Sequence, residues 1–143
     1  MNATICRIAE SIRANDFSAY QRERYSAIQD GEIVRFIDED FSGVDFNQFV
    51  MGFFVFQNCN LDDAKHIYGQ PIYFINSSVR NVDFRGVKAI IEAKDCDFRG
   101  IKYDEETQFV YGSGKLAARS RFINCKLDDE TRDFLSQQGA KIN

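Results

Sequence analysis

Few residues of this chain have types and spacings that could do chemistry. The candidates are four cysteines and a single histidine. Cys6, Cys59, Cys96 and Cys125 lack the paired spacing of a zinc site, so we interpret them as buried reduced thiols, with a disulfide or a metal site as alternatives. His66 has no Asp, Cys or Ser partner at a readable spacing and occupies a position where an inward residue is due, which favours a structural role over catalysis or metal binding.

Two further motifs imitate catalytic ones. The run from Gly112 to Lys115 suggests a phosphate-binding loop, but Lys115 is followed by Leu116 and the rest of that motif is absent. The adjacent carboxylates Asp62-Asp63 and Asp128-Asp129 fit turns and helix caps better than an acid–base pair. We therefore predict a non-enzymatic protein with no catalytic residue, no metal and no cofactor.

Composition limits the partners. The chain has 143 residues, a net charge of −4 and a pI of about 5.0, which argues against direct nucleic-acid binding. We find no apolar run long enough to span a membrane and no signal peptide, so we expect no membrane association and a cytoplasmic location.

The main pattern lies between residues 36 and 64, where large apolar residues recur every five positions. Helices repeat at 3.6 residues and strands at two, so this period belongs to neither. Residues two positions earlier are also apolar, with Glu39 as the exception. Each unit therefore points two side chains inward and then turns a corner, which winds the chain into a coil. The series is Phe36, Phe41, Phe46, Met51, Phe56 and Leu61.

Asp or Asn often separates the two inward residues, as at Asp45, Asn60, Asp83 and Asp97, and both types suit tight turns. Internal repeats support a coil. Residues 56–63 match residues 122–129 at six of eight positions, and residues 83–88 match residues 97–102 at five of six. The small position of the repeat is occupied by Cys59, Ser77, Cys96 and Cys125.

These units resemble the pentapeptide-repeat family, over roughly residues 34–127, and the chain resembles a degenerate, distant member. Phase slips follow Leu61, Phe84 and Phe98. The resemblance implies an all-β solenoid, a right-handed four-sided β-helix, here of about four to five coils. It also implies which residues are inward: Phe46, Leu61, Phe84 and Phe98 at the centre, with Val44, Cys59, Val82 and Cys96 as small neighbours.

We divide the chain into an N-terminal helical cap (1–31), a β-helix (32–127) with an excursion loop at 103–121, and a C-terminal capping helix (128–143). Terminal caps are expected because an open coil end behaves as an exposed sheet edge. Single residues set the expected helix limits. Ile5, Ile8 and Ile12 are expected in a first helix, and Asp16 is expected to cap a second helix that has Phe17, Tyr20 and Ile28 on one face and ends at Asp30-Gly31. We also expect a bulged turn at Gly69 and Pro71, and a last helix that Asp128 caps and Gly139 ends.

A rigid coil with few pockets suits a protein partner. Our leading hypothesis is a bacterial immunity or inhibitor protein that blocks a basic toxin or enzyme. The expected partner-binding residues are Asp104, Glu105, Glu106, Tyr111, Lys115, Asp62 and Asp63. Alternatives are a DNA-mimicking protector of DNA gyrase or topoisomerase, which the family resemblance suggests, and a structural scaffold; the chain is expected to be a monomer or a homodimer. Arg85, Arg99, Lys88 and Lys102 could form a basic stripe, but we favour the interpretation that they are solvated surface.

Overall fold

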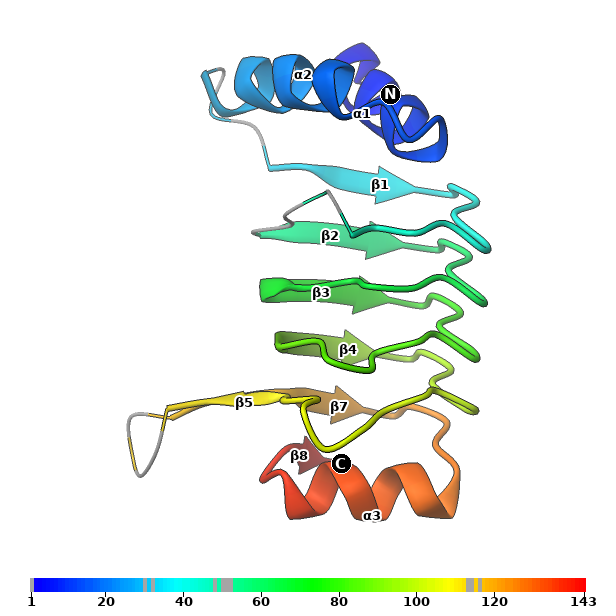
Figure 1. Ribbon diagram of the computed structural model, residues 1–143, viewed down its shortest axis with the longest axis vertical. Helices are drawn as coiled ribbons and strands as arrows, with labels where there is room; N and C mark the ends of the chain where they lie inside the picture. The colour runs from blue at the N-terminus through cyan, green and yellow to red at the C-terminus, as the bar shows by residue number, and fades with distance from the viewer. Residues whose placement is uncertain are drawn as a thin grey trace.

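The computed structural model describes residues 2–29, 31, 33–47, 49, 53–112, 115 and 117–143. It is a parallel β-solenoid of about five turns with two helices at its N-terminal end and one at its C-terminal end (Figure 1). The predicted fold class is confirmed, including the helical caps at both ends.

One side of the solenoid is a six-stranded parallel sheet with the order β1-β2-β3-β4-β7-β8. Successive coils each contribute one strand, so strand order follows chain order apart from the excursion between β4 and β7. The strands are β1 (Arg35–Ile37), β2 (Phe54–Gln57), β3 (Gly69–Ile75), β4 (Ala89–Lys94), β7 (Arg121–Ile123) and β8 (Lys141–Ile142).

The other three sides are held by single parallel bridges between coils. Because these sides are short, each contributes one paired residue per coil rather than a strand. With the sheet, the three rows of bridges give the coil its four sides. The rows are Asp40–Asn60–Ser78–Asp97–Lys126, then Asp45–Lys65–Asp83–Lys102, then Lys88–Gln108.

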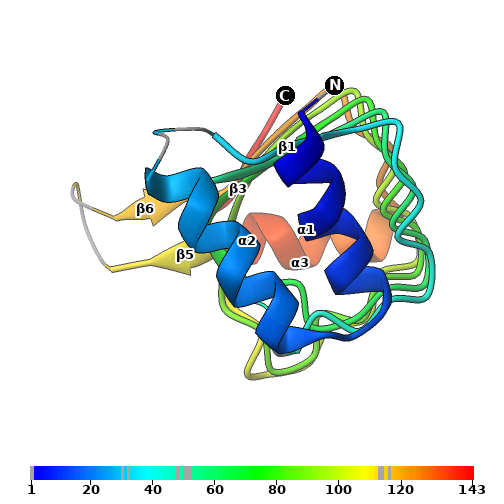
Figure 2. The same cartoon turned by 90° about the horizontal axis from the view of Figure 1, so that it is seen from above.

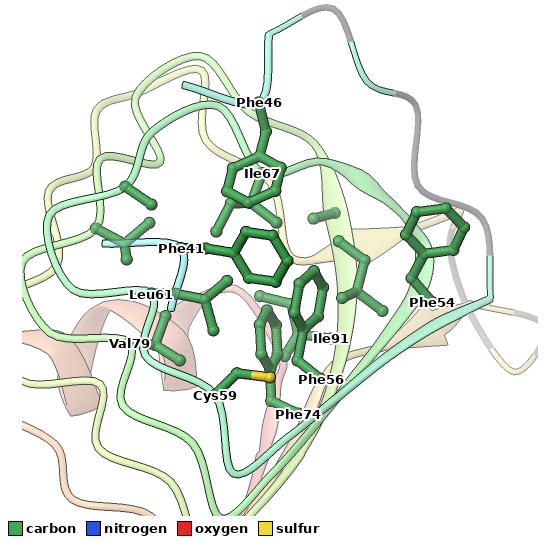
Figure 3. Packing of buried hydrophobic residues seen from close by; sticks show 14 of the residues in the cluster. Phe41, Phe46, Phe54, Phe56, Cys59, Leu61, Ile67, Phe74, Val79 and Ile91 are labelled. Atoms are coloured by element: carbon green, nitrogen blue, oxygen red, sulfur yellow. The ribbon is translucent and has the colours of Figure 1, made fainter. Parts of the chain in front are cut away.

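Stacked phenylalanines fill the interior (Figure 3). Phe36, Phe56 and Phe74 occupy equivalent positions of β1, β2 and β3, with ring centroids 5.2 and 5.3 Å apart. Ala93 takes this position in β4, and the ring of Phe98 from the next side fills the space, 5.8 Å from Phe74. The coils therefore keep their internal volume by exchanging large and small residues between adjacent sides.

The inward positions implied by the repeat are confirmed. The four central residues Phe46, Leu61, Phe84 and Phe98 are fully buried, and their small neighbours Cys59, Val82 and Cys96 are buried. Val44 is half-buried. Met51, a member of the five-residue series, lies outside the described residues.

The N-terminal cap consists of α1 (Ala3–Arg13) and α2 (Phe17–Gln29), which lie across the first coil (Figure 2). As predicted, Asp16 caps α2, accepting a hydrogen bond from the Ala19 amide at 3.0 Å. The predicted apolar face of α2 is confirmed at Tyr20 and wrong at Ile28, which is 59% exposed, while Phe17 lies at the edge of the buried face with 37% exposure. The buried face runs through Tyr20 and Ala27, and the Tyr20 ring packs edge-on against Phe49 with centroids 4.8 Å apart.

The C-terminal cap is α3 (Asp129–Gln137) followed by β8. Leu135 is fully buried against the last coil, and the ring of Phe134 stacks on Tyr103. Gly139 ends the helix with a φ of 88°, as predicted from its position.

The prediction that His66 occupies an inward position is wrong. Lys65 pairs with Asp83 and Gly69 pairs with Ala89, so the segments 65–69 and 83–89 are equivalent sides of adjacent coils. The first segment advances four residues and the second advances six. In the shorter crossing His66 adopts a φ of 59°, its ring turns outward, and Ile67 is the buried residue.

The predicted bulged turn at Gly69 and Pro71 is a bulge within β3 rather than a turn. The pairing of β3 with β4 shifts register between Gly69 and Ile72. The shift lets the strand accommodate a proline, which has no amide hydrogen to donate.

The excursion is shorter than predicted. Gln108 still pairs with Lys88, and Phe109 is fully buried, so the coil continues past residue 107. The part that leaves the solenoid is the antiparallel hairpin of β5 (Val110–Tyr111) and β6 (Ala118–Arg119), which projects to one side in Figure 2. The amide of Ser120 donates to the carbonyl of Phe109 at 3.0 Å and closes the hairpin at its base.

Candidate protein-binding surface

Asp and Asn side chains shape the corners of the coils. Asp45, Asn60, Asp83 and Asp97 each accept a hydrogen bond from the backbone amide two residues later, at 2.9–3.0 Å. This local bond bends the backbone without help from the core, which accounts for the residue type at these positions. The polar residues predicted next to the corners therefore stabilise the turns.

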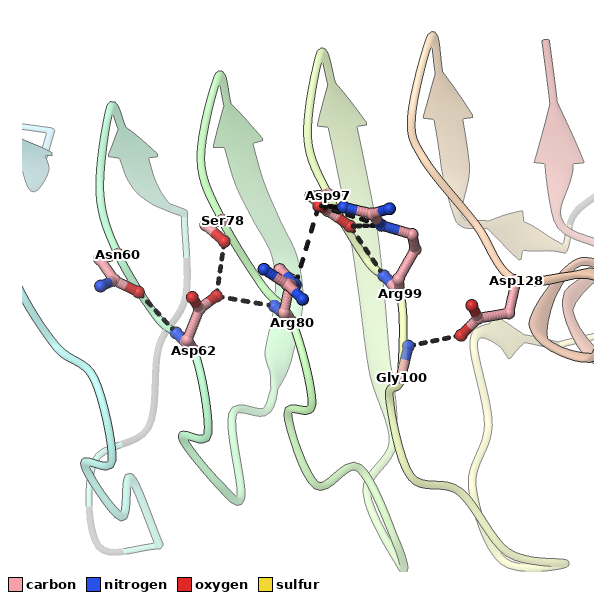
Figure 4. A network of polar contacts seen from close by, with 8 residues as sticks. All are labelled: Asn60, Asp62, Ser78, Arg80, Asp97, Arg99, Gly100 and Asp128. Carbon is pink, nitrogen blue, oxygen red and sulfur yellow. Dashed lines mark hydrogen bonds and ion pairs between the residues drawn. The ribbon is translucent and has the colours of Figure 1, made fainter.

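Two of these carboxylates also hold arginines at the surface. Arg85 donates to Asp83 through Nε and Nη2 at 2.9 and 2.7 Å. Arg99 binds Asp97 in the same way, and Figure 4 shows this second pair. The hydrogen bonds from Arg85 lower the pKa of Asp83 to about 2, and those from Arg99 lower the pKa of Asp97. The matched arginines are thus paired with carboxylates, which fits the favoured interpretation of solvated surface.

Asp62, one of the predicted partner-binding residues, links two coils. Its Oδ1 accepts a hydrogen bond from the Ser78 hydroxyl at 2.5 Å and one from the Arg80 amide at 3.0 Å (Figure 4). Asp63 is exposed at the corner with a φ of 63°. The pair therefore divides into one carboxylate that ties the coils together and one that faces solvent.

Asp128 has the same role further along the solenoid. Its Oδ2 accepts a hydrogen bond from the Gly100 amide at 2.5 Å (Figure 4). Among the described residues, it makes no side-chain capping bond to α3, the helix that it precedes. The prediction that Asp128 caps this helix is therefore wrong in its chemistry, because the carboxylate is used to join two coils.

Asp104 also has a structural role. Its Oδ1 accepts hydrogen bonds from the amides of Gly86 at 3.0 Å, Glu106 at 3.0 Å and Thr107 at 3.2 Å. The Gly86 bond is the main reason that the pKa of Asp104 lies below its usual value. Of the three predicted carboxylates in this loop, Glu105 and Glu106 extend into solvent while Asp104 fixes the turn.

Carboxylates of the C-terminal cap gather around Tyr103. Its ring stacks on Phe134 with centroids 3.9 Å apart. Burial, followed by the nearby carboxylates of Glu130, Asp128 and Asp133, raises the pKa of Tyr103. We call this region the acidic end. It consists of Asp104, Glu105, Glu106, Asp128, Asp129, Glu130 and Asp133.

A hollow of about 380 Å³ lies within the acidic end. Tyr103, Asp128 and Glu130 line it together with two basic side chains, Arg85 and Lys102. The surface therefore offers carboxylates, an aromatic ring and a few cations within one area.

The remaining predicted partner-binding residues lie on the hairpin. Tyr111 is 58% exposed on β5, and Lys115 is exposed beyond it. The predicted set thus falls in three places: the acidic end, the corner at Asp62-Asp63, and the hairpin.

Sequence reasoning missed a surface on the outer face of the sheet. Ile33 and Phe53 are 63% and 65% exposed, and with Val55, Tyr73 and Ile75 they line a hollow of about 390 Å³. We call these five residues the apolar sheet face. The signal was the alternation within each strand, in which Tyr73 and Ile75 point away from buried Phe74, but the stronger five-residue period concealed it.

The histidine and the cysteines have structural surroundings. Nδ1 of His66 lies 2.8 Å from Oδ1 of Asp45 at an exposed corner. Cys59, Cys96 and Cys125 carry free thiols at the small position of their coils. Burial raises the pKa of Cys59 to about 11, and a hydrogen bond with Cys125 together with burial raises the pKa of Cys96. Within the described ranges, no three potential metal ligands cluster.

None of the described helices is long and apolar enough to cross a membrane. No protein-family model and no curated protein sequence matches the chain.

Proposed function

We propose that this protein is a non-enzymatic binding module whose acidic end holds and blocks a basic protein partner. The observation that carries the proposal is the set of exposed carboxylates on either side of Tyr103. Asp104, Glu105 and Glu106 follow it in the chain, and the carboxylates of Asp128, Glu130 and Asp133 from the C-terminal cap lie near its hydroxyl. Complementary charge speeds the encounter of two proteins and selects between partners.

The rigidity of the scaffold supports this role. The acidic end is supported from both sides, because Asp104 is tied to the preceding coil and Gln138 bridges the cap to the last coil. The Gln138 side chain accepts from the Phe109 amide at 3.0 Å and donates to the Thr107 carbonyl at 2.9 Å. A preformed surface loses little conformational entropy on binding.

The most specific version of the proposal is an immunity or inhibitor protein for a basic bacterial toxin or enzyme, such as a nuclease. Such a partner would place a cationic patch against Glu105, Glu106 and Glu130. We also propose that the solenoid is a divergent pentapeptide-repeat protein, which the five-residue spacing of its buried side chains supports.

The test is an affinity capture from the lysate of the native host, with the tagged chain as bait and mass spectrometry as readout. The variant Glu105→Lys with Glu106→Lys reverses two exposed charges and leaves Asp104 in place to hold the turn. We expect one basic protein on the unaltered bait, and at least about tenfold weaker binding to the double variant. Binding should also weaken at high salt.

The control is Glu10→Lys, which makes one such charge reversal at an exposed position of α1, at the opposite end of the solenoid, and is compared with each single reversal, Glu105→Lys and Glu106→Lys. It should leave capture unchanged. A partner that binds the double variant as well as the unaltered chain would show that the acidic end is not the binding surface. Capture of a topoisomerase would favour the DNA-mimic alternative.

A further inference from the structure

In the part of the chain that the structure describes, no element covers the apolar sheet face over the first half of the sheet. On the outer side of β4, Ile90 is 8% exposed, and the β5–β6 hairpin contacts that strand. Over β1 to β3 the large side chains remain open: Ile33, Ile37, Phe53 and Ile75 are 37–65% exposed. An exposed apolar surface of this kind is typical of an interaction site.

Phe53 combines exposure with an unusual backbone. Its φ is 62°, a conformation that bulky residues rarely adopt. The amide of Phe53 donates to the Pro71 carbonyl at 3.1 Å, which fixes the residue beside the neighbouring coil. A strained backbone that presents an aromatic ring to solvent indicates a functional rather than a packing role for that ring.

The strand register sets which residues would meet if two copies packed through this face. In one chain Arg35, Val55 and Tyr73 lie in one row across the strands, and Ile37, Gln57 and Ile75 in the next. A half-turn about an axis along β2 exchanges β1 with β3 and leaves each row in place. Each row then gives one pairing between the outer strands and one at the axis. The first row pairs Arg35 with Tyr73 and Val55 with Val55, and the second pairs Ile37 with Ile75 and Gln57 with Gln57.

This arrangement is self-complementary. Isoleucine meets isoleucine, and the guanidinium of Arg35 meets an aromatic ring, a favourable cation–π pairing. Gln57 accepts a hydrogen bond from Arg35 at 3.0 Å and holds that guanidinium on the outer face. Phe53 of each copy lies next to the axis and would contact its own equivalent.

The other face-to-face arrangement is disfavoured. A half-turn about an axis that runs along the solenoid through the row of Arg35 would place this residue opposite Arg35 of the second copy, and two like charges would be buried together. The charge on the sheet face therefore favours the antiparallel arrangement over this one.

We propose that the apolar sheet face is the interface of a homodimer in which two solenoids pack sheet to sheet and antiparallel. This proposal is independent of the acidic end, which lies beyond β4 and outside the paired strands. Three strands span only about 15 Å at a spacing of 4.7–4.9 Å. The interface is at the small end of the size range for specific contacts, so we expect a dissociation constant in the micromolar range.

The test is sedimentation equilibrium of the full chain between about 5 μM and about 1 mM. We expect the mass to rise from the monomer value of 16.5 kDa toward twice that value. Phe53→Ser should weaken association at least about tenfold. Tyr111→Ser, which removes an aromatic ring of similar exposure from the hairpin, should leave association unchanged. Circular dichroism would verify that each variant is folded.

A charge exchange tests the geometry. Arg35→Glu alone should weaken the dimer, and adding Tyr73→Arg should restore it, because the two positions face each other across the proposed axis. A mass of 16.5 kDa at every concentration would overturn the proposal. So would a dimer that Phe53→Ser does not weaken, or a folded double variant in which association is not restored.

Discussion

At the scale of the residue, carboxylates have two separable tasks in this protein. Asp83, Asp97 and Asp104 accept backbone hydrogen bonds and fix corners, whereas Glu105 and Glu106 are exposed beside one such corner. Side-chain length accounts for the division, because the short Asp side chain reaches the amide two residues later within one turn. Acidic residues in such a solenoid are therefore binding candidates only after the turn-forming ones are set aside.

The paired carboxylates make stability depend on pH. The pKa of Asp83 is lowered to about 2 by Arg85, and that of Asp97 is lowered by Arg99. A carboxylate whose pKa is lower in the folded state stabilises that state above its unfolded pKa of about 3.9 and loses this effect as the pH falls. We expect the melting temperature to fall between about pH 4 and about pH 2 as these pairs are protonated.

The double variant Asp83→Asn with Asp97→Asn isolates the ion pairs, since Asn can still accept the turn amide. It should melt several degrees below the unaltered chain at pH 7, and this difference should shrink as the pH falls from about 4 through 2. Thermal melts followed by circular dichroism would measure this. A constant difference between the two proteins across the pH range would contradict the pairing.

At the scale of the element, the coils share one interior, and adjacent sides compensate for each other. Coil two pairs Phe56 with Leu61, whereas coil four pairs Ala93 with Phe98 at the same spacing. The ring of Phe98 contacts Phe122 of the next coil as well, with centroids 5.2 Å apart. The unit that is packed is thus the coil, and a small residue at one position is balanced by a large one on the next side.

This compensation predicts strong coupling between two positions. Ala93→Phe alone should overpack the interior and Phe98→Leu alone should leave a cavity, each costing about 1–3 kcal/mol. Together they recreate the arrangement of coil two. The double variant should be more stable than the sum of the single costs by at least about 1 kcal/mol.

Urea unfolding of the four proteins gives the coupling free energy. Phe84→Leu with Ala93→Phe provides a control, because Phe84 is an equally buried ring on a different side of the coil. If the losses in the free energy of unfolding are additive in the Ala93–Phe98 pair as they are in the control pair, the two positions do not compensate for each other's volume.

At the scale of the whole molecule, the helices at the ends keep the solenoid from continuing into another chain. α3 covers the last coil through Leu135, and the amide of Ala140 then donates to the Leu135 carbonyl as the chain turns into β8. Without such cover, the unpaired backbone groups of a final coil would pair with a second molecule.

Leu135→Ala should therefore affect association as well as stability. We expect a loss of about 2–4 kcal/mol in the free energy of unfolding and aggregation at a lower temperature, followed by light scattering during heating. Ser136→Ala, at an exposed position of the same helix, serves as the control and should behave as the unaltered chain. Equal scattering from both variants would contradict the role of α3.

The sequence was sufficient to predict the solenoid, its inward residues and its two caps, because a five-residue period with Asp and Asn at the corners fits neither a helix nor a flat sheet. It was insufficient where the period changes. His66 lies outward because its coil is two residues shorter, and Pro71 lies within a strand because a bulge accommodates it. The apolar sheet face was missed because residues such as Phe53 and Tyr73 come together only when strands from three coils align.

The closed base of the hairpin has a consequence for protein engineering. The chain leaves the solenoid after Phe109 and returns at Ser120, and the hydrogen bond between these two residues means that both ends of the excursion meet at one point. A segment that is inserted between Phe109 and Ser120 therefore does not have to match the length of a coil. The position therefore suits peptide display, since a loop or a small domain with adjacent termini can be grafted there without altering the pairing of β4 with β7.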